Sequence, residues 1–137
     1  MVYKIINADL LIVQLRYHYW KSFSVNDIQQ LTEILRRFRD ERDWAQFHNA
    51  KDLALALNIE AAELLEVFLW KTSEQADIDS VKEELADVFT FALLLADKYG
   101  LDVKQIVLEK MEKNARKYPI EKSKGSAKKY TELWVYR

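Results

Sequence analysis

The chain has 137 residues, of which 50% are hydrophobic and 31% charged, with a net charge of −1 and no cysteine. This length suits one domain with a hydrophobic core, and the composition is that of a globular protein rather than a disordered one. The lack of cysteine excludes disulfide frameworks and thiolate metal sites, and no run reaches the roughly 18 apolar residues of a membrane span, so we expect a cytoplasmic protein.

Residues 1–23 form an N-terminal extension that does not follow the helical pattern of the rest of the chain. Between residues 11 and 20, apolar and polar side chains alternate with the period of a strand, and "YTELWVYR" at residues 130–137 alternates more weakly. We predict that both terminal segments are extended and that they pair as a small sheet or cap a partner subunit. An amphipathic extension of the first helix is the competing interpretation.

The first two helices are predicted from apolar periodicity and from capping residues. Ser24 or Asn26 can cap a helix over residues 27–42. Asn49 can cap a second helix, which runs to about Lys71.

Two further helices follow the polar connector "TSEQADID". The third is predicted over residues 77–99, and Gly100 is well placed to end it in the left-handed conformation. Asp102 can cap the fourth, over residues 103–117, and Pro119 stops it. Four helices joined by short connectors predict an all-α fold, an antiparallel four-helix bundle with extended N- and C-terminal segments.

Charge is unevenly distributed along this bundle. Residues 60–87 contain nine acidic and two basic residues, a net charge of −7, whereas residues 110–130 contain eight basic and two acidic residues, a net charge of +6. We therefore divide the chain into an extension (1–23), a helical catalytic domain (24–119) and a basic extended tail (120–137). An acidic middle and a basic end suit a ligand composed of a cation and a polyanion, although two solvated faces would give the same pattern.

Two pairs of carboxylates are the strongest chemical signal. Glu60 and Glu63 share a face of the second helix, and Glu84 and Asp87 share a face of the third. If these helices pack antiparallel, the four carboxylates converge, and their mutual repulsion would raise their pKa values unless a cation binds. Oxygen ligands without Cys or His predict Mg²⁺, with Mn²⁺ as the other possibility.

Other side chains near these pairs suit a nucleotide. Four aromatic side chains flank the second and third helices and offer flat faces for a base: Trp44, His48, Trp70 and Phe91. Lys110 and Asn114 near the end of the fourth helix can donate to phosphates. The alternative interpretation is that the aromatic rings belong to the core and that the basic residues only complement a helix C-terminus.

The sequence resembles the MazG-like all-α nucleoside triphosphate pyrophosphohydrolases, and within them the dCTP pyrophosphatase branch. The stretches that resemble the family are "ERDWAQFHNAKDLALALNIEAAELLEVFLWKT", "EELADVFTF", "KMEKNARKYP" and "KGSAKKYTEL". They occur in the family's order and with similar spacing over roughly residues 24–133. The pair of motifs E-x-x-E and E-x-x-D is the family's signature.

The resemblance implies hydrolysis of a nucleoside triphosphate to a monophosphate and pyrophosphate, in order to clear modified or surplus nucleotides. It assigns Mg²⁺ binding to the four signature carboxylates, the walls of the base pocket to Trp44 and Trp70, and substrate contacts to Lys110 and Asn114. It also implies a dimer or tetramer in which helices of neighbouring subunits complete the site. We expect neither a membrane nor a polymeric nucleic acid as a partner. As catalytic base we select Glu63.

Two positions depart from the pattern of the dCTP-preferring relatives. Those proteins have a histidine where this chain has Leu35, and a tyrosine where it has Phe91. Each change removes a polar group from the implied base pocket, so we predict broader base tolerance or a shifted preference.

Two other classes of protein share parts of this pattern. A di-iron bundle needs E-x-x-H pairs, and no histidine lies three residues after a glutamate in this sequence. A catalytically silent nucleotide-binding or interaction bundle would keep the apolar stripes of the helices, but it would not need all four carboxylates.

Overall fold

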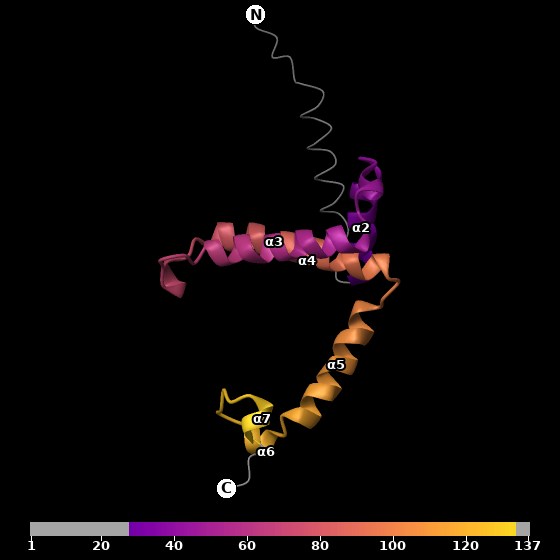
Figure 1. Cartoon of the computed structure of the whole chain (residues 1–137). Coiled ribbons are helices and arrows are strands. Elements are labelled where there is room, and N and C mark those ends of the chain that lie inside the picture. The colour runs from indigo at the N-terminus through magenta and orange to yellow at the C-terminus, as the bar shows by residue number, and fades with distance from the viewer. Residues whose placement is uncertain (1–27, 134–137) are drawn as a thin grey trace, which may run out of the picture.

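The structure, a computed structural model, describes residues 28–133, and every regular element in this range is helical (Figure 1). In chain order the elements are α2 (Ile28–Asp40), the 3₁₀ turn η1 (Trp44–Gln46), α3 (Ala50–Glu66), the 3₁₀ turn η2 (Ser73–Gln75), α4 (Ile78–Lys98), α5 (Val103–Lys117), α6 (Ile120–Ser123) and α7 (Tyr130–Leu133). The predicted all-α class is confirmed. The strand predicted over residues 11–20 falls outside the described residues.

The helix ends follow the predicted capping residues closely. Asn49, Asp77 and Asp102 each accept a hydrogen bond from the backbone N–H three residues further on, at 2.9–3.0 Å. Gly100 adopts the left-handed conformation, with φ 61°, directly after α4. Each such cap contributes about 1 kcal/mol, which explains why local sequence predicted these ends well.

The core lies where α3 and α4 pack side by side. The two helices run antiparallel, and α2 crosses them at the end where α3 begins and α4 finishes (Figure 1). Among the described residues, the buried apolar side chains belong to α3 and the second half of α4: Leu53, Leu93, Leu94 and Ala96. This small core joins α3 to α4 and fixes the relative position of the two carboxylate pairs.

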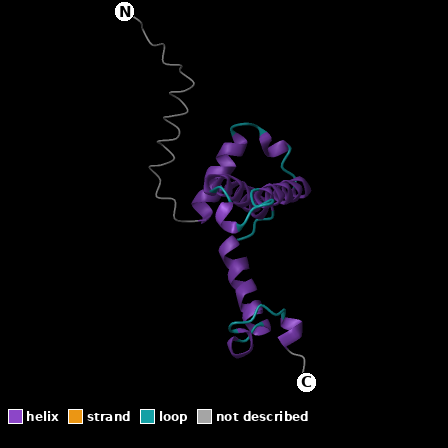
Figure 2. Cartoon of the chain, turned by 90° about the vertical axis from the view of Figure 1, so that its left-hand side faces the viewer, coloured by secondary structure: helices purple, strands orange, loops and turns teal. Residues whose placement is uncertain are grey.

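The fourth predicted helix leaves this core. Helix α5 begins beside the end of α4 and then extends away from α3 and α4 (Figures 1 and 2). Its apolar side chains stay open to solvent, with exposed fractions of 50% for Val107, 54% for Leu108 and 51% for Met111. The antiparallel arrangement predicted for the bundle is therefore seen in α3 and α4, whereas the apolar side chains of α5 find no cover in the part of the chain that is described. No helix in that part has both the length and the apolar character that crossing a membrane requires.

Two segments differ from the predicted secondary structure. Helix α3 ends at Glu66, earlier than the predicted Lys71, because the following hydrogen bonds shorten to three residues and Trp70 turns left-handed at φ 59°. The tail was expected to be extended, but residues 120–133 form two one-turn helices joined by a loop. The ring of Tyr130 packs edge-on against Tyr118, with centroids 5.9 Å apart, and this contact folds the tail back on the end of α5.

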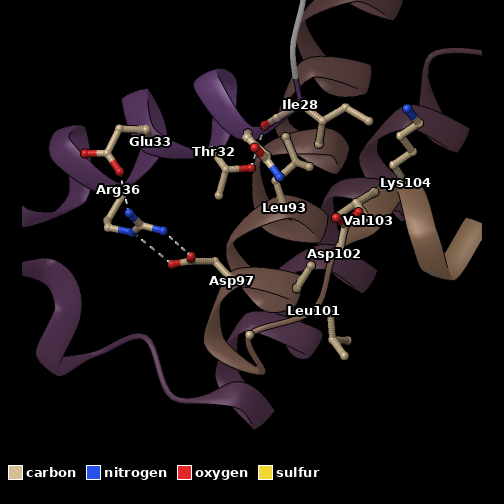
Figure 3. Close-up of a pocket in the computed structure, with 13 residues that line it drawn as sticks. Ile28, Thr32, Glu33, Arg36, Leu93, Asp97, Leu101, Asp102, Val103 and Lys104 are labelled. Atoms are coloured by element: carbon tan, nitrogen blue, oxygen red, sulfur yellow. Dashed lines mark hydrogen bonds and ion pairs between the residues drawn. The ribbon is translucent and has the colours of Figure 1, made fainter.

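An ion-pair cluster joins α2 to the end of α4. The guanidinium of Arg36 binds both carboxylate oxygens of Asp97, and it also binds Glu33 within α2 (Figure 3). Arg39 approaches the same Asp97 carboxylate at 3.9 Å. Hydrogen bonding from Arg36 lowers the pKa of Asp97 below its ordinary value, and the charges of both arginines reinforce this. The cluster thus fixes the angle at which α2 crosses α4.

We expect Asp97→Asn to lower the free energy of unfolding by about 1–2 kcal/mol, between the values for exposed and buried ion pairs. Because folding lowers the pKa of Asp97, its contribution is present above the unfolded pKa and is lost as the pH falls through the folded pKa. Urea unfolding at fixed protein concentration should therefore show a difference at pH 7 that shrinks below about pH 4. Asp79→Asn is the control, because its pair with Lys82 is exposed on both sides, and it should change stability by less than about 0.5 kcal/mol.

Candidate metal and nucleotide site

Three of the four signature carboxylates meet between α3 and α4. Oxygen atoms of Glu60 on α3, and of Glu84 and Asp87 on α4, all lie within 4.8 Å of one another. They meet because each helix presents its acidic pair at i, i+3 spacing and the two helices pack antiparallel. Glu60 and Glu84 are half-buried, whereas Asp87 is exposed, so the cluster opens on the surface of the helix pair.

The electrostatics of the cluster are those of several negative charges held close together. Loss of solvent raises the pKa of Glu60 and that of Glu84 above the ordinary value for glutamate. Neighbouring negative charges raise the pKa of both groups further, and for both they include Glu63 and Asp87. A divalent cation would remove this repulsion, and a set of hard carboxylate oxygens fits Mg²⁺ or Mn²⁺.

The structure treats Glu63 differently from the other three predicted ligands. Its side chain is exposed, and among the described residues the group within 4.8 Å consists of Glu60, Glu84 and Asp87 without it. Its charge nevertheless acts on both Glu60 and Glu84, so it lies at the edge of the cluster. The roles predicted for Glu63, as a metal ligand and as the catalytic base, therefore stay predictions.

Three of the predicted aromatic residues form ring contacts at the end of the helix pair where α3 begins. The ring of His48 lies 6.4 Å from that of Phe91, which is one helical turn beyond Asp87 on α4. Trp44 in η1 contacts Phe38 edge-on at 6.0 Å. Both rings of that second pair are partly exposed, so aromatic surface is open to solvent at this end of the helix pair.

Arg42 belongs to the same aromatic group and was not predicted. Its guanidinium carbon lies 3.5 Å above the centroid of the Phe38 ring and 5.8 Å from that of Trp44. The signal was present in the sequence, because Phe38 and Arg42 are four residues apart and so share a helix face. Stacking of this arginine restrains both rings.

Trp70 lies far from Trp44 in the same chain. The two residues flank α3, whose 17 residues span about 26 Å. Trp70 is 94% exposed and has φ 59°, a conformation that is strained for a bulky side chain. One chain therefore does not bring these two tryptophans to a common base.

The predicted phosphate ligands are also separated from the carboxylates. Lys110 and Asn114 both lie on α5, which extends away from the α3–α4 pair (Figures 1 and 2). At the far end of α5 the ammonium of Lys117 lies 4.9 Å from the centroid of the Tyr130 ring. The basic residues of the predicted site thus lie on α5 and the segments that follow it, whereas its acidic residues lie on α3 and α4.

A separate pocket of about 360 Å³ lies where α2, the end of α4 and the start of α5 meet (Figure 3). Its wall includes the Arg36–Asp97 pair, Leu93 and Leu101, and it includes none of the predicted site residues. Its two cationic lining side chains, Arg36 and Lys104, are balanced by carboxylates in the same wall, so it lacks the charge excess that a triphosphate requires.

Comparison with known proteins agrees with the motifs. The model of the MazG-like family matches residues 55–133. The chain is 40% identical over 122 residues to dCTP pyrophosphatase 1 of Bos taurus, a match that covers 81% of this chain and 72% of that protein. It is 37% identical over 114 residues to dCTP pyrophosphatase 1 of Homo sapiens, covering 77% and 67% of the two chains.

A solved structure has a similar fold. The crystal structure of a pyrophosphatase from Archaeoglobus fulgidus superimposes with a TM-score of 0.63 and 43% sequence identity, over 66% of this chain and 91% of that chain. The resemblance seen in the motifs is confirmed by these matches.

Proposed function

Because this chain belongs to the MazG-like family, we propose that it is a magnesium-dependent pyrophosphohydrolase of dCTP or of related or modified nucleotides. The chain is a nucleoside triphosphate pyrophosphatase, an enzyme that converts its substrate to the monophosphate and pyrophosphate. It would act on nucleotide pools in the cytoplasm. The observation that supports this most directly is the convergence of Glu60, Glu84 and Asp87 within 4.8 Å.

Each part of the site has a proposed task. Glu60, Glu84 and Asp87, with Glu63 at their edge, would hold Mg²⁺. When bound, the cation supplies charge neutralisation for the triphosphate and Lewis acidity toward the cleaved anhydride. Glu63 would accept a proton from the attacking water. The rings of Trp44 and Phe91 would hold the base, so that the α-phosphate lies beside the carboxylates.

A second copy of the chain would complete this site. The carboxylates lie on α3 and α4, whereas Lys110 and Asn114 lie on α5. Trp44 and Trp70 lie beyond opposite ends of α3, a helix about 26 Å long. A two-fold axis that brings α5 and Trp70 of a partner to the carboxylates and Trp44 of this chain would join all of them.

The exposed apolar surface supports the same assembly. Side chains on α3, α4 and α5 remain open to solvent in one chain, to a degree that is uncommon for a monomer: Ile59 54%, Leu65 70%, Phe89 57%, Leu108 54% and Met111 51%. A dimer or tetramer would cover them.

The test of function is a product analysis. We expect the protein with MgCl₂ to convert triphosphates to monophosphate and pyrophosphate, and EDTA to abolish turnover. Across the eight standard nucleotides, preference for dCTP over dTTP or dATP should stay below about a hundredfold, because Leu35 and Phe91 supply no hydrogen bond to the base.

Two outcomes would contradict the proposal in different ways. Release of diphosphate and orthophosphate would contradict the site of cleavage. If the folded protein bound Mg²⁺ and nucleotide without turnover of any standard or modified triphosphate, it would instead be a silent nucleotide-binding bundle.

A further inference from the structure

The ring of Trp44, to which the proposed function assigns the base, is not fixed by burial. Trp44 is 44% exposed, and it belongs to the three-residue turn η1 rather than to a long helix. A ring that becomes ordered only when a ligand stacks on it loses conformational freedom at that moment, and this loss weakens binding. A ring that is held beforehand avoids the loss, so the contacts that orient Trp44 bear directly on substrate affinity.

Arg42 forms one cluster with Phe38 and Trp44. Its guanidinium carbon lies 3.5 Å from the centroid of the Phe38 ring and 5.8 Å from that of Trp44. The centroids of the two rings are 6.0 Å apart. All three distances lie within the range over which a cation and aromatic rings attract one another, so each member of this cluster contacts the other two.

Arg42 is itself anchored to the end of α2. Its Nη1 donates a hydrogen bond of 2.9 Å to the carbonyl oxygen of Phe38, one of the last four carbonyl groups of the helix. These carbonyls have no partner inside the helix, and a cationic side chain near the helix C-terminus is favoured there. The guanidinium therefore presents a fixed plane to the two rings.

The backbone between Arg42 and Trp44 turns the tryptophan toward this plane. Asp43 has φ 55° and ψ 30°, a left-handed conformation that costs energy for a residue with a side chain. The side-chain amide of Gln46 stabilises the turn by donating to the carbonyl oxygen of Asp43 at 2.9 Å and to its carboxylate at 2.8 Å. The turn allows Trp44 to contact Phe38, six residues earlier in the chain.

We propose that Arg42 is a positioning residue for Trp44, because it holds the indole ring in the orientation in which a base stacks on it. This inference rests on the proposed function, and it adds a residue that acts through Trp44 and not by contact with the substrate. Loss of Arg42 should therefore raise KM and leave kcat near the wild-type value, since the carboxylate cluster is unchanged.

A double-mutant cycle measures whether Arg42 acts through the ring. Arg42→Leu should raise KM for dCTP about five- to tenfold with less than about a twofold change in kcat, whereas Arg42→Lys, which keeps a cation beside the rings, should stay within about threefold of wild type. In a Trp44→Ala background, Arg42→Leu should change KM by less than about a further twofold. The matched control is Arg37→Leu, which removes an arginine paired with Glu33 on the exposed side of α2 and should keep KM within about twofold.

Two kinetic results would overturn the inference. If Arg42→Leu raises KM as much in the Trp44→Ala background as in wild type, Arg42 does not act through the ring. If it raises KM for dCTP but leaves calorimetric binding of dCMP unchanged, Arg42 contacts the outer phosphates, because a displaced ring would weaken both nucleotides to a similar extent.

The motion of the ring can also be measured without turnover. In a full-length chain with Trp20, Trp70 and Trp134 replaced by Phe, time-resolved fluorescence anisotropy reports on Trp44 alone. Arg42→Leu should increase the amplitude of the subnanosecond decay, and Arg42→Lys should largely restore the wild-type decay. Arg42→Gln replaces Arg42→Leu if the latter does not fold.

This measurement separates failure of the inference from failure of the proposed function. An unchanged decay in the folded Arg42 variant would show that the arginine does not restrain the indole, even in an active enzyme. A wild-type chain that hydrolyses no triphosphate would contradict the proposed function, and the anisotropy and the binding of dCMP would still decide the role of Arg42.

Discussion

Glu60→Gln is expected to reduce nucleotide hydrolysis by at least about a hundredfold while leaving the metal-free protein as stable as wild type or more stable. The loss of activity follows from the position of Glu60, the only α3 carboxylate within the 4.8 Å group among the described residues. The gain in stability follows from charge, because the neutral amide of Gln removes a repulsion that burial intensifies.

The pH dependence of stability has a definite sign. Folding raises the pKa of Glu60 and of Glu84, so the folded state is favoured most below the unfolded pKa of about 4.3. That contribution is lost as the pH rises through the raised folded pKa. Thermal unfolding without metal should therefore show wild type losing stability relative to Glu60→Gln between about pH 4 and pH 7.

Magnesium should reverse the order of the two proteins. Mg²⁺ binds the folded state, so it should raise the melting temperature of wild type at pH 7 and have little effect on Glu60→Gln. Glu112→Gln is the matched control. It removes the same charge from an exposed site on the side of α5 opposite Lys110 and Asn114, and it should keep activity within about twofold. A Glu60→Gln enzyme that retains turnover would show that the cluster is not the catalytic centre.

Activity should rise when two impaired variants are combined in one oligomer. Glu60→Ala removes a carboxylate, and Trp70→Ala removes a ring whose stacking on a base is worth about 1–3 kcal/mol, or about fivefold to 150-fold in kcat/KM. In a mixed dimer with two-fold symmetry, one site would contain both substitutions and the other neither. Co-expressed in equal amounts, the pair should reach about a quarter of wild-type activity, because half of the dimers are mixed and half of their sites are intact.

The controls for this experiment separate assembly from contamination. A chain with both substitutions, co-expressed with wild type, should give mixed dimers with no intact site. By contrast, the mixed dimer of Glu60→Ala and Trp70→Ala has one intact site of two. Purified through two different affinity tags, it should show half of wild-type activity. If Glu60→Ala is complemented by Trp44→Ala and not by Trp70→Ala, the partner supplies the opposite end of α3. If neither pair recovers activity, the site is built within one chain.

Local sequence was sufficient for most of the fold. The ends of α3, α4 and α5 depend on side chains within four residues, such as Asn49 and Asp102, and on Gly100, and those interactions can be read from the chain itself. The carboxylate pairs were equally visible, because i, i+3 spacing places two side chains on one face wherever the helix lies. The early end of α3 at Glu66 was not predicted, since it depends on a strained turn at Trp70.

The tertiary structure decided how these parts combine. It brings Glu60 to Glu84 and Asp87 and leaves Glu63 at the edge, a distinction that depends on the rotation of α3 against α4 and not on spacing along either helix. It buries Nδ1 of His48 beside Phe91, and it directs α5 away from the core. Contacts between residues far apart in the chain determine each of these, and helical periodicity contains no information on the angle at which one helix meets another.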